Sequence, residues 1–174
     1  MTTDENGLPT PDARETALME RLNALQIATR TYAHAAVFTV EEARALRGAL
    51  PGTHTKNLFL EDRRGGLWLV VAREELSIDL NALSKALGAP RFSFGKPETM
   101  IAVLGIAPGA VTPFALMNDR DARVNVVFDD GMRGDPLNFH PLRNDKTMAI
   151  ALSDLLRFVA ATGHEVRTLV LPQR

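Results

Sequence analysis

Leucines at helical spacing mark the first element of the chain. Leu18, Leu22 and Leu25 recur every three or four residues, which is the spacing of one helix face. Thr10 and Pro11 precede them, and these residue types are typical of an N-cap and a first helical position. We expect a helix from this point to about residue 27, preceded by a flexible polar tail over residues 1–9.

A β-hairpin is the clearest strand pattern. The apolar segments 56–61 and 67–72 flank the turn Asp62-Arg-Arg-Gly-Gly66. Glycines supply the positive φ angles that such turns need, so the two segments are expected to pair as neighbouring strands.

Short helical patterns alternate with short apolar segments over the rest of the chain. A capping box at residues 39–42 predicts a brief helix to about residue 46, and leucines at helical spacing before Gly88 predict another over residues 79–87. The other expected elements are strands at 31–34, 91–94, 123–128, 138–140, 147–151 and 165–171, a helix between Pro97 and Gly105, and a helix over 154–162 with Ser153 as N-cap.

The order of these elements indicates the fold class. Several links are hairpin-like and too short for a parallel crossover, which argues against a doubly wound nucleotide-binding fold. We predict a mixed α/β (α+β) protein with a curved, barrel-like mixed β-sheet flanked by short helices. No long Gly, Ser or Pro linker divides the chain, so residues 10–174 are expected to form one domain.

Composition excludes several chemistries. The 174 residues are 45% apolar, and a chain of this length buries roughly 70% of its unfolded surface. With no cysteine there is no disulfide, thiolate nucleophile or cysteine-based metal site. The net charge of -1 gives no overall attraction to nucleic acid.

Standard motifs and targeting signals are also missing from the sequence. There is no phosphate-binding loop, dinucleotide fingerprint, H-E-x-x-H or G-x-S-x-G, and the four histidines lack metal-ligand spacing. We therefore expect neither a metal nor a cofactor. No signal peptide or membrane span is apparent, so a cytoplasmic protein that does not contact membranes is expected.

Residues 53–57, Thr-His-Thr-Lys-Asn, lead directly into an apolar strand. Lys56 at the mouth of that strand could hold a phosphate or ribose oxygen, and the Asn57 amide could orient a carbonyl or hydroxyl group. The alternative is a solvated lysine beside a turn asparagine.

The segment from Gly109 to Pro113 is a second candidate. Glycine permits close backbone approach and proline fixes the loop shape, so amide groups here could face a carbonyl oxygen. The alternative is a purely structural turn.

His140 ends an apolar strand immediately before a proline. Its ring could enter a pocket to bond substrate or transfer a proton. The alternative is a structural histidine at a strand end.

Together these segments resemble a known family. The segments 53–60, 87–94, 104–118 and 139–145 resemble the YbaK/prolyl-tRNA-synthetase-associated editing-domain family, in particular its free-standing ProX (PrdX-like) branch of alanyl-tRNA(Pro) deacylases. The likeness extends from about residue 18 to residue 171, and His-Thr-Lys-Asn-Leu-Phe-Leu is its most specific part.

The resemblance implies hydrolysis of the ester that joins a wrong amino acid to the 3′-terminal adenosine of tRNA(Pro). A synthetase pocket built for proline rejects the smaller alanine only weakly, so editing restores accuracy. It also implies a water nucleophile assisted by a substrate ribose hydroxyl. The implied partners are the 3′ end and acceptor stem of mischarged tRNA(Pro), with a transient contact to prolyl-tRNA synthetase.

The resemblance also assigns the site residues. Lys56 matches the main functional lysine near the terminal adenosine, Asn57 its polar neighbour and His140 a functional histidine. The implied substrate-binding residues are His54, Thr55, Gly109, Ala110, Val111, Thr112 and Pro113.

Two alternatives stay open. Pocket size could select another mischarged tRNA, such as cysteinyl-tRNA(Pro) or a seryl- or threonyl-tRNA. From a different class, the chain could be a non-catalytic module that binds tRNA or the synthetase.

Overall fold

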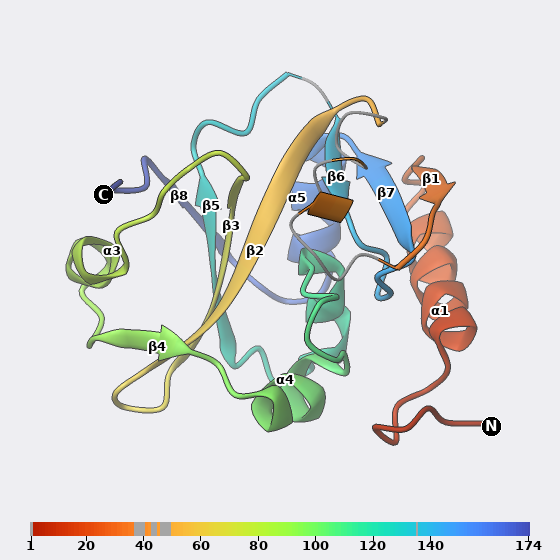
Figure 1. Cartoon of the computed structure of the whole chain (residues 1–174), viewed down its shortest axis with the longest axis horizontal. Coiled ribbons are helices and arrows are strands. Elements are labelled where there is room, and N and C mark those ends of the chain that lie inside the picture. Colours follow the sequence, from red (N-terminus) through yellow and green to blue (C-terminus); the bar gives the residue numbers. More distant parts are fainter. Residues whose placement is uncertain (1, 37–40, 43–44, 46–49, 135) are drawn as a thin grey trace.

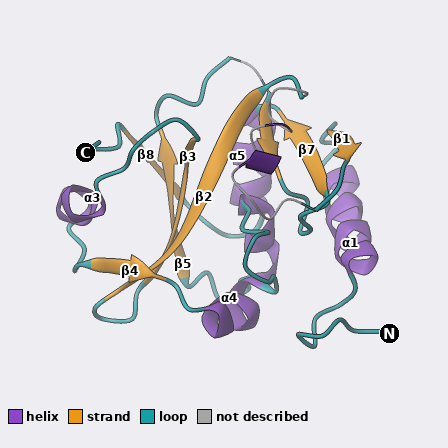
Figure 2. Ribbon diagram, viewed as in Figure 1, coloured by secondary structure: helices purple, strands orange, loops and turns teal. Residues whose placement is uncertain are grey.

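The computed structural model describes residues 2–36, 41, 42, 45, 50–134 and 136–174, and Figures 1 and 2 show its helices and strands. The helices are α1 (Pro11–Ala24), α3 (Leu80–Leu87), α4 (Pro97–Leu104), the 3-10 helix η1 (Pro113–Asn118) and α5 (Leu152–Ala161). The strands are β1 (Arg30–Ala33), β2 (Thr53–Asp62), β3 (Leu67–Arg73), β4 (Phe92–Phe94), β5 (Val124–Asp129), β6 (Leu137–Phe139), β7 (Lys146–Ile150) and β8 (Val166–Leu169). The helix expected at residues 39–46 falls largely outside the described residues.

Eight strands form one mixed sheet, which confirms the predicted fold class. Its order is β1-β7-β6-β2-β3-β5-β8, and β4 also pairs with β2. Neighbours pair in parallel at β2–β6, β3–β5 and β5–β8, and antiparallel elsewhere. The predicted hairpin is confirmed, since β2 and β3 are antiparallel with Thr55 opposite Arg73 and Glu61 opposite Leu67.

The long strand β2 joins the two halves of the sheet. Its first residues, Thr53 and His54, pair with β6, whereas its last three residues pair with β4 on the same side. Figure 1 shows β2 running diagonally across the molecule, with β6 beside its start and β4 beside its end. The middle of β2 lies between these two pairings.

Each face of the sheet carries its own hydrophobic core. The larger core joins the sheet to α1, α4, η1 and α5, and it includes Leu18, Leu104, Phe114, Phe128 and Phe158. The smaller core packs α3 against Leu60, Val70 and Val127 on the opposite face. This burial of apolar side chains on both faces is what stabilises the curved sheet.

Helix ends follow the sequence signals with two exceptions. The helix expected to reach about residue 27 ends at Ala24, because Gln26 takes a left-handed φ of 57°. Thr10 caps α1 with Pro11 in its first turn, and Asp79 and the left-handed Gly88 bound α3. The prediction of Ser153 as the N-cap of α5 is wrong, because the helix starts at Leu152, directly after β7, with Ala151 as N-cap. Leu152 packs against the larger core, and this contact draws the first turn toward the strand.

The N-terminal segment makes several polar contacts in the structure. Asp4 Oδ1 accepts hydrogen bonds from the amides of Asn6 at 2.8 Å and Leu8 at 3.1 Å. Arg14 of α1 binds Asp4 Oδ2 at 3.0 Å, and Leu8 is buried. These bonds fold the segment back onto α1.

A search of the described residues finds no helix long and apolar enough to cross a membrane.

Candidate functional site

Lys56 and Asn57 lie inside a strand. We expected them at its mouth, but β2 begins at Thr53, so they occupy its fourth and fifth positions. Successive side chains of a strand leave on opposite faces, so the two residues serve different sides of the sheet.

One face gathers the charged and imidazole side chains. The parallel pairing of His54 with Asn138 places both on the face opposite the larger core. Lys56 and His140 each lie two residues beyond this pair along strands that run in the same direction. The pairing therefore brings the Thr-His-Thr-Lys-Asn and Asn-Phe-His segments to one region of the fold.

The Lys56 side chain is half-buried and extends toward α3. Its Nζ donates a hydrogen bond to the carbonyl of Leu76, and it lines a cavity of about 500 Å³ together with Leu58, Leu80, Arg91 and Phe94. The ammonium group has further hydrogens to donate, so it can hold an anionic or hydroxyl oxygen.

Asn57 leaves β2 on the face of the larger core. Its Oδ1 atom is buried and has no hydrogen-bond partner within the described structure. A buried amide oxygen without a partner costs free energy, and such an atom is an indication of a binding function. Asn57 also lies in the stretch of β2 between the pairings to β6 and β4, where the sheet is open on that side.

The neighbouring positions hold the strands together. Thr55 Oγ1 donates to the Asn138 carbonyl at 2.7 Å and so ties β2 to β6. The His54 carbonyl accepts from the Glu74 amide at 3.1 Å. Both residues therefore support the placement of Lys56 and Asn57.

The predicted loop from Gly109 to Pro113 begins with a tight turn. Gly109 has φ of 95°, which only glycine adopts readily, and the Ala110 amide donates to Ala107 at 3.3 Å. This bond already engages one amide of the loop. A side chain built on Gly109 would meet no atom within 4 Å, so the approach to the turn is open.

The end of this loop is buried. Thr112 accepts from the Phe114 amide at 3.4 Å, and Val111 packs against the larger core. The Phe114 ring stands edge-on to Phe139 with centroids 5.9 Å apart. Because Phe139 precedes His140, the loop is anchored one residue from the histidine.

His140 is held in one tautomer. Its Nδ1 lies 2.9 Å from the Lys146 carbonyl, which can only accept, so Nδ1 carries the hydrogen and Nε2 of the neutral ring is an acceptor. Burial lowers the pKa of His140 below its usual value, the nearby His34 ring acts in the same direction, and the bond to Lys146 opposes them. The neutral form is therefore favoured.

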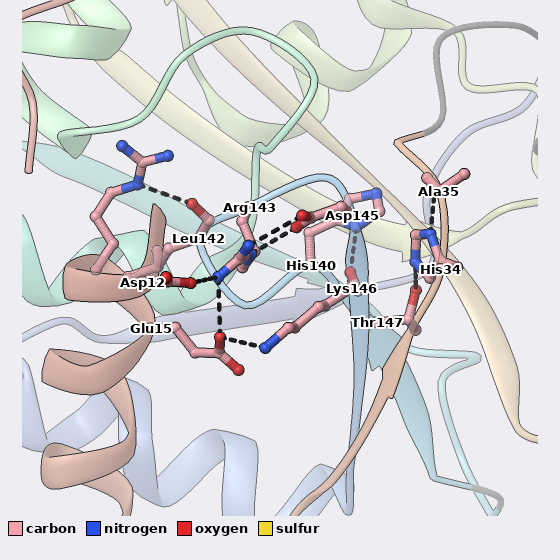
Figure 3. Close-up of polar contacts among 11 residues, drawn as sticks. Asp12, Glu15, His34, Ala35, His140, Leu142, Arg143, Asp145, Lys146 and Thr147 are labelled. Atoms are coloured by element: carbon pink, nitrogen blue, oxygen red, sulfur yellow. Dashed lines mark hydrogen bonds and ion pairs between the residues drawn. The ribbon is translucent and has the colours of Figure 1, made fainter. Parts of the chain in front are cut away.

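A second histidine lies beside it. The His34 and His140 ring centroids are 6.3 Å apart, and His34 Nε2 is 2.9 Å from Thr147 Oγ1 (Figure 3). Sequence reasoning gave His34 no role, because nothing in the local spacing connects it with a residue so distant along the chain.

No group of three or more His, Cys, Asp or Glu side chains in the described part of the chain could hold a metal ion.

The fold defines a mixed α/β protein whose polar site places Lys56 and the neutral His140 on one face of the sheet and the unpartnered Asn57 amide oxygen on the other. Asn138 Oδ1 is also buried without a partner in the described structure. The family model of the aminoacyl-tRNA editing domain matches residues 34–158. The chain belongs to the aminoacyl-tRNA editing domain family.

Curated relatives span nearly the same length. "Prolyl-tRNA synthetase associated domain-containing protein 1" of Bos taurus is 40% identical over 155 residues, which cover 86% of this chain and 90% of the relative. "Prolyl-tRNA editing protein ProX" of Acetoanaerobium sticklandii is 33% identical over 162 residues, covering 92% and 98%.

A solved structure of a candidate trans-editing enzyme for prolyl tRNA synthetase has the same fold. It superposes with a TM-score of 0.68 at 21% identity and covers 95% of this chain and 99% of that one. At this identity the likeness speaks for the fold alone.

Proposed function

We propose that this protein is a trans-editing deacylase that hydrolyses the ester of mischarged alanyl-tRNA(Pro). The observation that carries the proposal is the unpartnered, buried Asn57 Oδ1 beside Lys56 in a strand paired to the one that leads into His140. Membership of the editing-domain family and the relative named as a prolyl-tRNA editing protein support the same reaction class.

Lys56 and Asn57 would contact the terminal nucleotide from opposite faces of the sheet. The Lys56 ammonium would bind a phosphate or ribose oxygen on the α3 side, where it now donates to Leu76. The Asn57 amide would act from the other face, through the open stretch of β2 between the β6 and β4 pairings. The Gly109 turn, which is open above its glycine, would receive the aminoacyl group.

The chemical step would need no protein nucleophile. Water attacks the ester carbonyl carbon, the bond between that carbon and the ribose oxygen breaks, and the ribose oxygen leaves with a proton. The products are free alanine and tRNA with both terminal hydroxyls restored. The neutral His140 ring presents Nε2 as an acceptor, so it would orient the water or the adjacent ribose hydroxyl.

Charge balance limits how the tRNA would be held. A net charge of -1 favours a small contact with the 3′ end and nearby acceptor stem rather than a long track of phosphates. Association with prolyl-tRNA synthetase would be transient and would deliver the mischarged end. Affinity for the tRNA should therefore fall only shallowly with salt.

A deacylation panel tests the proposal. tRNA(Pro) charged with alanine, cysteine, serine or proline is mixed with the wild-type protein and with Lys56→Met, and release of each amino acid is followed. We expect alanine to be released fastest and Lys56→Met to be strongly impaired. Preference for cysteine or serine would overturn the alanine assignment, and binding without release of any amino acid would establish a non-catalytic module.

A further inference from the structure

We propose that Glu15 on α1 is a positioning residue for His140, acting through Arg143, in the connection between β6 and β7, and Lys146, the first residue of β7. The catalytic consequence rests on the proposed function, whereas the effect on the histidine ring does not. Figure 3 shows the contacts, with α1 on one side of this connection and the His34–His140 pair on the other.

One carboxylate oxygen joins the two basic residues to the helix. Glu15 Oε1 accepts from Lys146 Nζ at 2.7 Å and from Arg143 Nη1 at 3.1 Å. The side chains of Glu15 and Arg143 are only 16% and 12% exposed, so solvent screens this contact far less than an ordinary surface ion pair. The contact can therefore fix the connection against the helix.

Arg143 is itself rigidly held. Its guanidinium binds both oxygens of Asp145, at 2.5 and 2.9 Å, and Asp12 Oδ1 at 2.6 Å. The bidentate pair fixes the plane of the guanidinium group, and it holds the pKa of Asp145 below its usual range. A shift of Glu15 would therefore move the segment from Arg143 to Lys146 as a unit.

Helix α1 also stabilises an unfavourable backbone conformation in the connection between β6 and β7. Leu142 has φ of 65°, a left-handed backbone that branched side chains rarely adopt. Arg14 Nε donates a hydrogen bond to the Leu142 carbonyl at 3.0 Å, and the Leu142 side chain is buried. Strained backbone persists only where its surroundings hold it, and here α1 provides the hold.

These contacts converge on the ring of His140. The Lys146 carbonyl that fixes Nδ1 belongs to the residue whose Nζ binds Glu15. The titratable groups that act on the ring are His34 and Asp145, and the Lys146 backbone carbonyl accepts its hydrogen bond. Glu15 holds the Lys146 side chain directly and Asp145 through Arg143. Releasing Glu15 would therefore loosen the acceptor of Nδ1.

The test compares Glu15→Gln with Glu20→Gln, which removes an exposed carboxylate from the same helix. Nitrogen NMR of the imidazoles reads the tautomer and the titration of His140 without any substrate. In Glu15→Gln we expect the ring to lose its single Nδ1–H tautomer and its pKa to fall further, because the bond to Lys146 that raises this pKa is weakened. Glu20→Gln should match the wild type.

Kinetics provide the second readout. Glu15→Gln should lower kcat for alanyl-tRNA(Pro) by roughly tenfold while KM stays unchanged. This is the effect expected of a residue that orients a functional side chain without touching the substrate. The acid limb of the pH profile should move to lower pH, in step with the lowered pKa of His140. In a His140→Asn background, Glu15→Gln should cause no further loss.

The outcomes are separable. An unchanged His140 tautomer and titration in a folded Glu15→Gln protein would overturn this inference, whatever the activity. A wild-type protein that releases no amino acid would overturn the proposed function, while the NMR result still decides the positioning role. If Glu15→Gln does not fold, Lys146→Met serves instead, because it removes the side-chain tie and keeps the backbone carbonyl; normal His140 behaviour in that variant would equally overturn the inference.

Discussion

Lys56 and Asn57 are adjacent in sequence but leave β2 on opposite faces of the sheet. The Lys56 ammonium donates to Leu76 on the side of α3, whereas the Asn57 amide oxygen is buried on the other side without a partner. The two residues therefore contribute separately to the site, and their substitutions should have different signatures.

Lys56→Met should abolish most activity without unfolding the protein. The side chain is half-buried and its one recorded bond is to a backbone carbonyl, so we expect a change in unfolding free energy of less than about 1 kcal/mol. Loss of an electrostatic contact to substrate should lower kcat/KM by roughly 100-fold. Steady-state deacylation and urea denaturation measure the two effects. Lys85→Met, an exposed lysine on α3, is the matched control and should keep full activity.

Asn57→Ala should lower activity without lowering stability. Its amide oxygen has no partner to lose, so removing it relieves a buried polar atom and should leave the protein as stable as the wild type, or more stable by up to about 1 kcal/mol. Deacylation should still fall by roughly 10- to 100-fold if the amide orients the ester. Marked destabilisation with normal activity in the surviving folded protein would show that the amide is structural.

The pH dependence should follow the lowered pKa of His140. Activity should hold as pH falls through the usual histidine range near about 6.5 and decline only below it, because burial keeps the ring neutral. The free energy of unfolding should change in the same direction as the activity. As pH decreases below about 6.5, His140 takes up a proton in the unfolded chain before it does so in the folded protein. The free energy of unfolding therefore decreases as pH decreases, and it levels off once the folded ring is also protonated. His140→Asn should remove this component of the stability profile, as urea titrations at several pH values would show.

Asp119 should be required for stability and dispensable for chemistry. It is buried, binds His164 Nε2 at 2.8 Å and accepts from the amides of Arg123 at 3.1 Å and Val124 at 2.9 Å. Asp119→Ala leaves these donors unpaired and should cost about 3 kcal/mol in unfolding free energy. Asp121→Ala, an exposed carboxylate in the same turn, should cost less than about 0.5 kcal/mol. A specific activity in the folded Asp119→Ala protein far below that of the wild type would contradict this separation.

Much of the fold could be predicted from local signals. The Thr10–Pro11 helix start, the Gly88 end of α3 and the β2–β3 hairpin are each encoded within a few residues, and all are confirmed. The start of α5 was predicted wrongly, because its position depends on Leu152 packing against a core assembled from distant segments. Local capping preference was overridden by that contact.

For the candidate site, sequence identified residue types but not their geometry. Lys56, Asn57 and His140 could be named from motifs, while the contacts of Glu15 with Arg143 and of His34 with Thr147 join segments that no spacing rule relates. The 3-10 helix η1, which anchors the Gly109 loop through Phe114, was likewise not predicted. These features arise from tertiary packing and are visible only once the strands are paired.

The parallel pairing of Thr53 and His54 with Leu137 and Asn138 also bears on how the protein folds. Contacts between segments so far apart must pay the entropy of closing a long loop before they contribute any stability, so they form slowly and late. The β2–β3 hairpin can form early from neighbouring residues, but it carries Lys56 and Asn57 without His140. A nascent or partly folded chain therefore holds only half of the site, and the protein gains its complete site only when the whole sheet has closed around β2.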